Sequence, residues 1–177
     1  MCPVCLGAGY IEYGGDYHQS MRVECRECEG TGFNKNLKKY KIKGKSIFDV
    51  WKMTLDEAID FFEDIDKSIT KVCITASEIM LGHLQIGQAT ATLSGGENIR
   101  IKIMKASKST AKVIGVDEPF KGLSNIEIDA VANYLNRIRE KGKTLIVIDH
   151  STGVEDYFSQ WIQIENIDNR LIGKQFK

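Results

Sequence analysis

Two copies of one cysteine motif constrain the N-terminal part of this chain more than any other feature. Each copy has the pattern Cys-x-x-Cys-x-Gly-x-Gly, and nineteen residues separate the two pairs. The four cysteines are Cys2, Cys5, Cys25 and Cys28. Two such pairs supply four thiolates, enough to close a tetrahedral structural Zn²⁺ site without an open coordination position. A redox-active dithiol would explain one pair but not its duplicate, so the sequence predicts structural zinc.

The residues around these cysteines predict a small module. The glycine after each pair allows a turn in which backbone N–H groups face the sulfur atoms. Between the pairs, Tyr10–Tyr13 and Met21–Glu24 are expected to form a β-hairpin around Gly14 and Gly15. The fifth cysteine, Cys73, lies in an apolar helical pattern and is predicted to be a small core residue.

The composition limits the class of protein. A length of 177 residues suits one domain, or one domain with a small appendage. The 24 Lys and Arg residues equal the 24 Asp and Glu residues, so the overall charge predicts no polyanionic partner. No apolar run approaches the roughly 18 residues of a membrane span, and no signal peptide is evident. We therefore expect a cytoplasmic protein without a membrane partner, in which paired cysteines bind metal rather than form disulfides.

A second motif, Ser94-Gly95-Gly96-Glu97, precedes an amphipathic run. Ser94 is a good helix N-cap, and Glu97, three residues later, completes a capping box. The two glycines let the backbone approach a phosphate closely, and the positive end of the following helix favours an anion there. The motif therefore predicts a loop that contacts a phosphate.

Acidic residues follow a short apolar strand further along the chain. Two predicted strands end in polar residues: Val113–Val116 in Asp117 and Glu118, and Thr144–Ile148 in Asp149 and His150. Open α/β sheets place ligand chemistry at such strand ends. The strand–helix–strand order predicts an α/β fold with buried strands in a mainly parallel sheet. A capped helix and an acidic turn would explain each motif alone, but not three motifs in this order.

Hydrophobic periodicity predicts the remaining elements. Three helices are expected besides the one after Gly96. The first begins at Thr54, with Glu57 as its capping-box partner, and the second covers roughly Ser68–Leu81. The third runs through Ile128–Ile138 and ends at Gly142. The helix after Gly96 is expected to direct Ile103 inward and Arg100 outward. Trp161–Ile167 is predicted to be a third buried strand.

A lysine-rich segment runs from Lys35 to Lys45, with six lysines and no acidic residue. On strand spacing, four of these lysines share one face. They could form a phosphate-contacting stripe, or an edge strand whose charges deter pairing with another chain; we favour the edge strand.

The end of the same segment, Gly44-Lys45-Ser46, imitates a P-loop. A P-loop has the pattern Gly-x-x-x-x-Gly-Lys-Ser/Thr, but the residue five positions before Gly44 is Lys39. No other glycine run fits, so these 177 residues contain no loop that would cradle ATP.

In order and spacing, the motifs resemble the C-terminal part of the UvrA family, the damage-recognising ABC-type ATPases of bacterial nucleotide excision repair. The resemblance covers nearly the full length. It includes the cysteine module, Lys43–Val50, Met53–Ala58, Leu84–Gln88 leading into Thr92–Glu97, Asp117–Pro119 with Gly122 and Leu123, and Ile148–His150. The cysteine module ahead of the signature loop is the most specific of these features.

The resemblance implies a role for each motif. Asp117 would lie in the Mg²⁺ shell, Glu118 would orient or deprotonate the attacking water, and His150 would contact the γ-phosphate. The loop residues Ser94, Gly95, Gly96 and Glu97 would close over ATP. DNA and a UvrB-like protein are the further partners that the resemblance implies.

The resemblance also implies a division into a zinc-binding module with a β-hairpin (1–46), a helical connector (47–92) and the C-terminal half of an ABC ATPase domain (93–177). The family's P-loop precedes the zinc module, and this chain starts on the first cysteine ligand, as though taken from a longer protein. We therefore expect ATP hydrolysis only with a P-loop-bearing UvrA-like polypeptide or a second copy, and negligible hydrolysis by the isolated chain.

Two other interpretations stay open. The chain departs from the family pattern at Phe120, Lys121 and Glu127. These departures suit a non-catalytic zinc- and DNA-binding or dimerisation module derived from UvrA. They also suit a UvrA paralogue that gives self-resistance to a DNA-binding compound.

Overall fold

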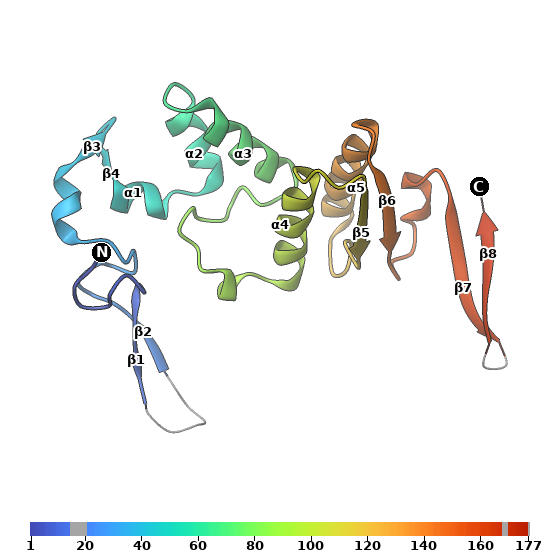
Figure 1. Ribbon diagram of the computed structural model, residues 1–177, viewed down its shortest axis with the longest axis horizontal. Helices are drawn as coiled ribbons and strands as arrows, with labels where there is room; N and C mark the ends of the chain where they lie inside the picture. The colour runs from blue at the N-terminus through green and yellow to red at the C-terminus, as the bar shows by residue number, and fades with distance from the viewer. Residues whose placement is uncertain (15–20, 168–169, 177) are drawn as a thin grey trace. The chain divides into compact units, whose positions relative to one another are not determined.

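The computed structural model describes residues 1–14, 21–167 and 170–176 (Figure 1). The chain divides into two compact units. The first comprises Met1–Ser77 and Gly82–Thr92, and the second comprises Glu78–Leu81 and Leu93–Lys177. Each unit is described by itself below.

The first unit contains short strands followed by helices. In chain order its elements are β1 (Tyr10–Tyr13), β2 (Met21–Glu24), η1 (Lys35–Lys39), β3 (Lys41–Ile42), β4 (Lys45–Ser46), α1 (Ile47–Lys52), α2 (Leu55–Phe62), α3 (Lys67–Glu78, whose last residue falls in the second unit) and η2 (Thr90–Thr92). Strands β1 and β2 pair antiparallel, with Tyr10 opposite Glu24, as predicted for the hairpin. Its predicted turn includes Gly15, which lies outside the described residues.

Helices α1 and α2 begin where a side chain can satisfy the free N–H groups of the first turn. Ser46 and Asp49 form a capping box at the start of α1, and Thr54 and Glu57 form one at the start of α2, as predicted. Such a cap contributes about 1 kcal/mol of stability. The predicted core cysteine, Cys73, is buried in α3.

The prediction of an edge strand over Lys35–Lys45 holds only for short pieces of its second half. Lys35–Lys39 forms the 3₁₀ helix η1, and only the two-residue strands β3 and β4 follow. The side chain of Asn34 accepts a hydrogen bond from the backbone N–H of Asn36 and so caps η1. This local cap outweighs the alternation of lysines that suggested a strand. Gly44 lies in the turn between β3 and β4, so the P-loop imitation is part of a hairpin.

The second unit alternates helices and strands. Its elements are α4 (Gly95–Ser107), β5 (Val113–Asp117), α5 (Asn125–Glu140), β6 (Thr144–Ile148), η3 (Glu155–Tyr157), β7 (Trp161–Ile167) and β8 (Arg170–Phe176). Strands β5 and β6 pair in parallel, with α5 as the crossover helix against β6 (Figure 1). The core of this unit consists of Ile103, Ile114, Val116, Phe120, Val131, Leu135 and Ile138. The strand–helix–strand order was therefore predicted correctly.

The predicted sheet needs two corrections. Of the described strand pairs only β5–β6 is parallel, whereas β7 pairs antiparallel with β8. Two residues separate β7 from β8, too few for the crossover that a parallel pair requires. The strands are also not buried on both faces. Side chains alternate, so that Ile114 and Val116 are buried while Ile146 and Ile148 are more than half exposed.

The outward orientation predicted for Arg100 is also wrong. Its side chain is only 5% exposed and lies against Glu127 of α5. Helical periodicity placed it on the polar face because no local signal shows that α5 supplies a carboxylate there. None of the described helices combines the length and the apolar character that a bilayer span requires.

Candidate functional site

The four paired cysteines form one buried cluster at the N-terminal end of the first unit. Their sulfur atoms all lie within 4.8 Å of one another. The Sγ–Sγ distance is 3.9 Å between Cys2 and Cys25 and 3.6 Å between Cys5 and Cys28. A tetrahedral ion with metal–sulfur bonds of about 2.3 Å places its sulfurs about 3.8 Å apart. The cluster is therefore close to the geometry that a four-coordinate metal ion requires.

The backbone around the cysteines supports the sulfur atoms, as the glycine pattern predicted. The N–H groups of Gly9 and Gly32 donate to Cys5 Sγ and Cys28 Sγ, both at 3.3 Å. The two halves pack so closely that a Cβ atom on Gly9 would lie 2.4 Å from the carbonyl oxygen of Gly30. Gly9 also has a φ of +79°, so both conformation and space require glycine here.

The thiol pKa values show why this cluster favours a cation. Burial raises the pKa of Cys5, but hydrogen bonds from the Gly9 amide and the Cys28 and Cys2 thiols outweigh it and lower the pKa to about 7. Burial, together with hydrogen bonds to the other three cysteines, raises the pKa of Cys28 to about 12. Four adjacent thiolates repel one another, so their simultaneous ionisation requires a bound positive ion.

Polar residues meet at the carboxyl ends of β5 and β6. Asp117 ends β5 opposite Ile148, which ends β6. The backbone N–H of Glu118 donates to the carbonyl oxygen of Ile148 at 2.7 Å. This hydrogen bond holds the turn after β5 against the end of β6. Glu118 has a φ of +48°, a strained value for a residue with a side chain. Asp117 is exposed, and no hydrogen bond or ion pair from the described residues reaches its carboxylate.

Two further contacts shape this strand end. The Glu118 carboxylate accepts a hydrogen bond from the Lys121 ammonium group at 2.6 Å. Asp149 accepts from the backbone N–H of Phe120 at 3.0 Å and of Ser151 at 2.7 Å. Burial works against ionisation of Asp149, but these hydrogen bonds outweigh burial and lower its pKa. Asp149 thus ties the loop after Glu118 to the end of β6, beside the exposed side chain of His150.

The sequence assigned no role to Asp149 beyond its place before His150. Its position directly after a strand that neighbours another acid-tipped strand was the available signal. The role of Arg100, in contrast, had no signal in the sequence.

The Ser94–Glu97 loop starts α4 as predicted. Ser94 Oγ accepts from the Glu97 backbone N–H, and the Glu97 carboxylate accepts from the Ser94 N–H at 2.7 Å. A Cβ atom on Gly96 would meet Leu123 Cδ2 at 3.4 Å, so the loop lies alongside the segment that follows Glu118. Among the described residues, no hydrogen bond joins Ser94, Gly95 or Gly96 to Asp117, Glu118 or His150. The structure therefore brings the two motifs near each other through Leu123.

A partly buried ion pair joins the middle of α4 to the start of α5. Arg100 Nη1 lies 3.3 Å from Glu127 Oε1. Hydrogen bonds from the Ser124 backbone and hydroxyl lower the pKa of Glu127, and Arg100 lowers it further. Glu127, a departure from the family pattern, is thus a capping-box residue within α5 rather than a loop residue.

Replacement of Arg100 by alanine is expected to destabilise the second unit by about 3 kcal/mol, because removing one partner strands a partly buried charge. Urea unfolding at neutral pH measures this, with Lys102→Ala in the same helix as a control that should cost less than about 0.5 kcal/mol. Because the pKa of Glu127 is lowered in the fold, the stabilisation is present above its ordinary pKa. It is lost as the pH falls through the folded value. Equal effects of the two variants would contradict the assigned contact.

The fold resembles that of the ABC-type ATPases. A chain from the complex of archaeal ribosomal stalk protein aP1 with archaeal ribosome recycling factor aABCE1 aligns with 71% of this chain and 23% of its own, with a TM-score of 0.50 and 23% identity. The similarity is far greater to UvrA2 from Deinococcus radiodurans, with a TM-score of 0.85 and 31% identity over 98% of this chain and 22% of that one.

Sequence comparison finds relatives that carry the name UvrA. UvrABC system protein A from Rickettsia bellii and from Staphylococcus epidermidis are each 37% identical to this chain over 156 residues. The chain is homologous to UvrA. The match covers 86% of this chain but 16% of each curated relative, so the chain spans a small part of their length. No family model matches the chain.

Proposed function

We propose that this chain is part of a UvrA-like ATPase of nucleotide excision repair, and that it binds and hydrolyses ATP only together with a P-loop-bearing segment. The observation that carries the proposal is the geometry at the ends of β5 and β6. There Asp117, Glu118 and Asp149 gather at one edge of the sheet, next to the segment that contacts the Ser94 loop through Leu123. The 177 residues include no Gly-x-x-x-x-Gly-Lys-Ser/Thr pattern.

In this proposal the described residues divide the work. The exposed Asp117 carboxylate is available to hold Mg²⁺, a cation that prefers one or two carboxylates together with phosphate oxygens. Bound Mg²⁺ would neutralise charge on the β- and γ-phosphates. Glu118, on its strained turn, would orient the attacking water, and His150 would contact the γ-phosphate. Cys2, Cys5, Cys25 and Cys28 would hold a structural Zn²⁺ ion.

The glycines of the signature loop support a nucleotide role. The described fold gives no reason for glycine at position 95, since nothing lies within 4 Å of a Cβ atom added there and its φ is not left-handed. Alanine is the better helix former. A close approach by a group outside the fold explains why this position lacks a side chain.

We expect Gly95→Ala to leave the thermal stability of the isolated chain unchanged or slightly higher, by up to about 1 kcal/mol. In the completed enzyme the same change should reduce ATP hydrolysis at least about tenfold, because a methyl group would hold the loop away from the phosphate. Phosphate release and a melting curve measure the two effects. Unchanged hydrolysis would remove the loop from the proposed site.

The test of the whole proposal is complementation. The metal-loaded chain is mixed with a UvrA segment that carries the P-loop and ends before the cysteine module, and phosphate release is measured. Activity of the mixture, with none from either part alone, supports the proposal. Robust hydrolysis by the 177-residue chain alone overturns it.

A second candidate is a binding module without catalysis, and the contact between Lys121 and Glu118 favours it. The Lys121 ammonium group pairs with the Glu118 carboxylate, which would otherwise be free to orient the attacking water. The other departures are structural in character, since Phe120 is fully buried and packs on Phe158. Failure of every P-loop-bearing segment to restore hydrolysis would favour this module. DNA, and a UvrB-like protein, are the partners proposed for either function.

A further inference from the structure

A small cavity in the first unit is lined by lysines from three elements. Its volume is about 210 Å³. Lys38 comes from η1, Lys41 from β3, and Lys52 from the end of α1, while Ser46 and Phe48 form part of the lining between them. Lys38 Nζ also lies 4.8 Å from the centre of the Phe48 ring. Three lysines from separate elements thus line one space.

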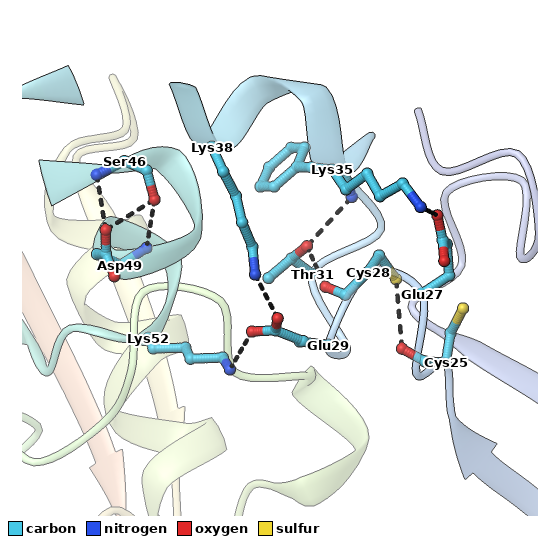
Figure 2. Close-up of polar contacts among 11 residues, drawn as sticks. Cys25, Glu27, Cys28, Glu29, Thr31, Lys35, Lys38, Ser46, Asp49 and Lys52 are labelled. Atoms are coloured by element: carbon cyan, nitrogen blue, oxygen red, sulfur yellow. Dashed lines mark hydrogen bonds and ion pairs between the residues drawn. The ribbon is translucent and has the colours of Figure 1, made fainter. Parts of the chain in front are cut away.

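The two carboxylates in this cavity are already engaged (Figure 2). Glu29 lies between two lysines, with Oε1 on Lys38 Nζ and Oε2 3.4 Å from Lys52 Nζ. Asp49 accepts hydrogen bonds from the Ser46 hydroxyl and amide, both at 2.7 Å. Within the described ranges no hydrogen bond or ion pair reaches the Lys41 ammonium group. The cavity therefore carries one more positive charge than negative charges.

Further lysines lie close to this cavity in the sequence, although Lys35 pairs with Glu27 and Lys43 with Asp64. From Lys35 to Lys45 the chain has six lysines and no acidic residue, although the whole molecule is neutral. Tyr40, in the middle of the segment, is 64% exposed, and Lys39 Nζ lies 5.1 Å from its ring centre. The edge strands β3 and β4 contain only Lys41 and Lys45, so protection against strand pairing does not explain the other four lysines.

We propose that this cavity, defined by Lys38, Lys41 and Lys52, binds a backbone phosphate of nucleic acid. Glu29 acts as an internal counter-ion that holds Lys38 and Lys52 in place. Because its carboxylate competes with the phosphate for these two ammonium groups, it weakens phosphate binding. A run of lysines beside an exposed aromatic ring suits a chain of phosphates and bases better than a single free anion. The inference rests on DNA as the partner proposed above and assigns it a site, which requires neither a P-loop nor ATP.

The cysteine module sets the position of the counter-ion. Glu29 follows Cys28 directly, and its φ of +52° belongs to the turn that brings Cys28 into the cluster. Glu27, between Cys25 and Cys28, pairs with Lys35 at 2.8 Å at the other end of η1 (Figure 2). One knuckle therefore holds the lysine-rich helix at two points.

The experiment measures binding of the full metal-loaded chain to a short fluorescein-labelled duplex DNA by fluorescence anisotropy, over a series of NaCl concentrations. The double variant Lys38→Gln/Lys41→Gln is expected to raise the Kd about threefold to tenfold and to reduce the salt slope by about 1, the loss of one phosphate contact. Glu29→Gln is expected to act in the opposite direction, with a lower Kd and a steeper slope. If Glu29 had only a structural role, its replacement by glutamine would not strengthen DNA binding.

The matched control is Lys108→Gln/Lys141→Gln, which removes two exposed lysines of the second unit and should leave Kd and slope unchanged. Metal content and circular dichroism show whether each variant keeps its fold. Any of three results overturns the proposal: no DNA binding by the parent chain at low salt, an equal loss in the control, or weaker binding by Glu29→Gln with its metal retained. A parallel titration with inorganic phosphate distinguishes binding of a free phosphate ion from binding of a nucleic-acid backbone phosphate. Variant-sensitive binding of the free ion without binding of DNA would overturn the assignment to nucleic acid.

Discussion

Cys25→Ser is expected to abolish stoichiometric metal binding and to unfold the cysteine module, because a closed tetrahedral site needs all four thiolates. The module has little else to hold it. Its cluster of buried residues consists of the four cysteines with Ile11 packed against them, and every residue of β2 is exposed. Structural zinc contributes on the order of 10 kcal/mol to the folding of comparable small modules. Metal analysis of the purified chain and amide hydrogen exchange over residues 1–14 and 21–33 measure the result.

The chain offers a matched control for this experiment. Cys73 is buried in α3 outside the cluster, and burial raises the pKa of its thiol. Cys73→Ser should therefore retain one metal ion per chain and cost only the modest penalty of a buried hydroxyl, roughly 1–3 kcal/mol. Retention of one ion by Cys25→Ser would show that the four sulfurs do not act as one site.

Glu118→Gln in the complex with a P-loop-bearing segment is expected to reduce ATP hydrolysis by a factor of about 10²–10⁴, the range attributed to a positioned general base. Nucleotide binding should persist, because the amide keeps the size of the carboxylate and Asp117 remains to hold Mg²⁺. Phosphate release and binding of a fluorescent ATP analogue measure the two quantities separately.

Glu140→Gln, at the exposed end of α5, is the control for this variant and should hydrolyse ATP at the parent rate. Full activity of Glu118→Gln in the complex would assign the chemistry to another group. It would also favour the interpretation in which Lys121 keeps Glu118 as a structural ion-pair partner.

Features that depend on a few neighbouring residues could be predicted from the sequence. The capping boxes at Ser46, Thr54 and Ser94 follow from residue types three positions apart, although only the last two were recognised beforehand. The cysteine cluster follows from spacing and from the glycines that permit each turn. The parallel pairing of β5 with β6 follows from the helix between them, since a crossover of that length leaves few alternatives.

Features that depend on residues far apart in the chain could not be predicted from the sequence. Arg100 was assigned to the polar face because the carboxylate that accepts it lies 27 positions away in α5. The lysine-rich segment was assigned to a strand because its charges alternate, while its actual partners, Glu27 and Glu29, come from the second cysteine knuckle.

The sequence by itself determined which chemical groups this protein has and where its local elements begin, because helix caps, turns and metal knuckles are short-range structures. Only the tertiary structure decided which groups face each other. It placed Asp149 under the loop after Glu118 and Glu29 between Lys38 and Lys52. The physical reason is that hydrogen bonds and ion pairs between elements depend on how whole helices and strands pack, and periodicity along one element does not record what the next element brings to it.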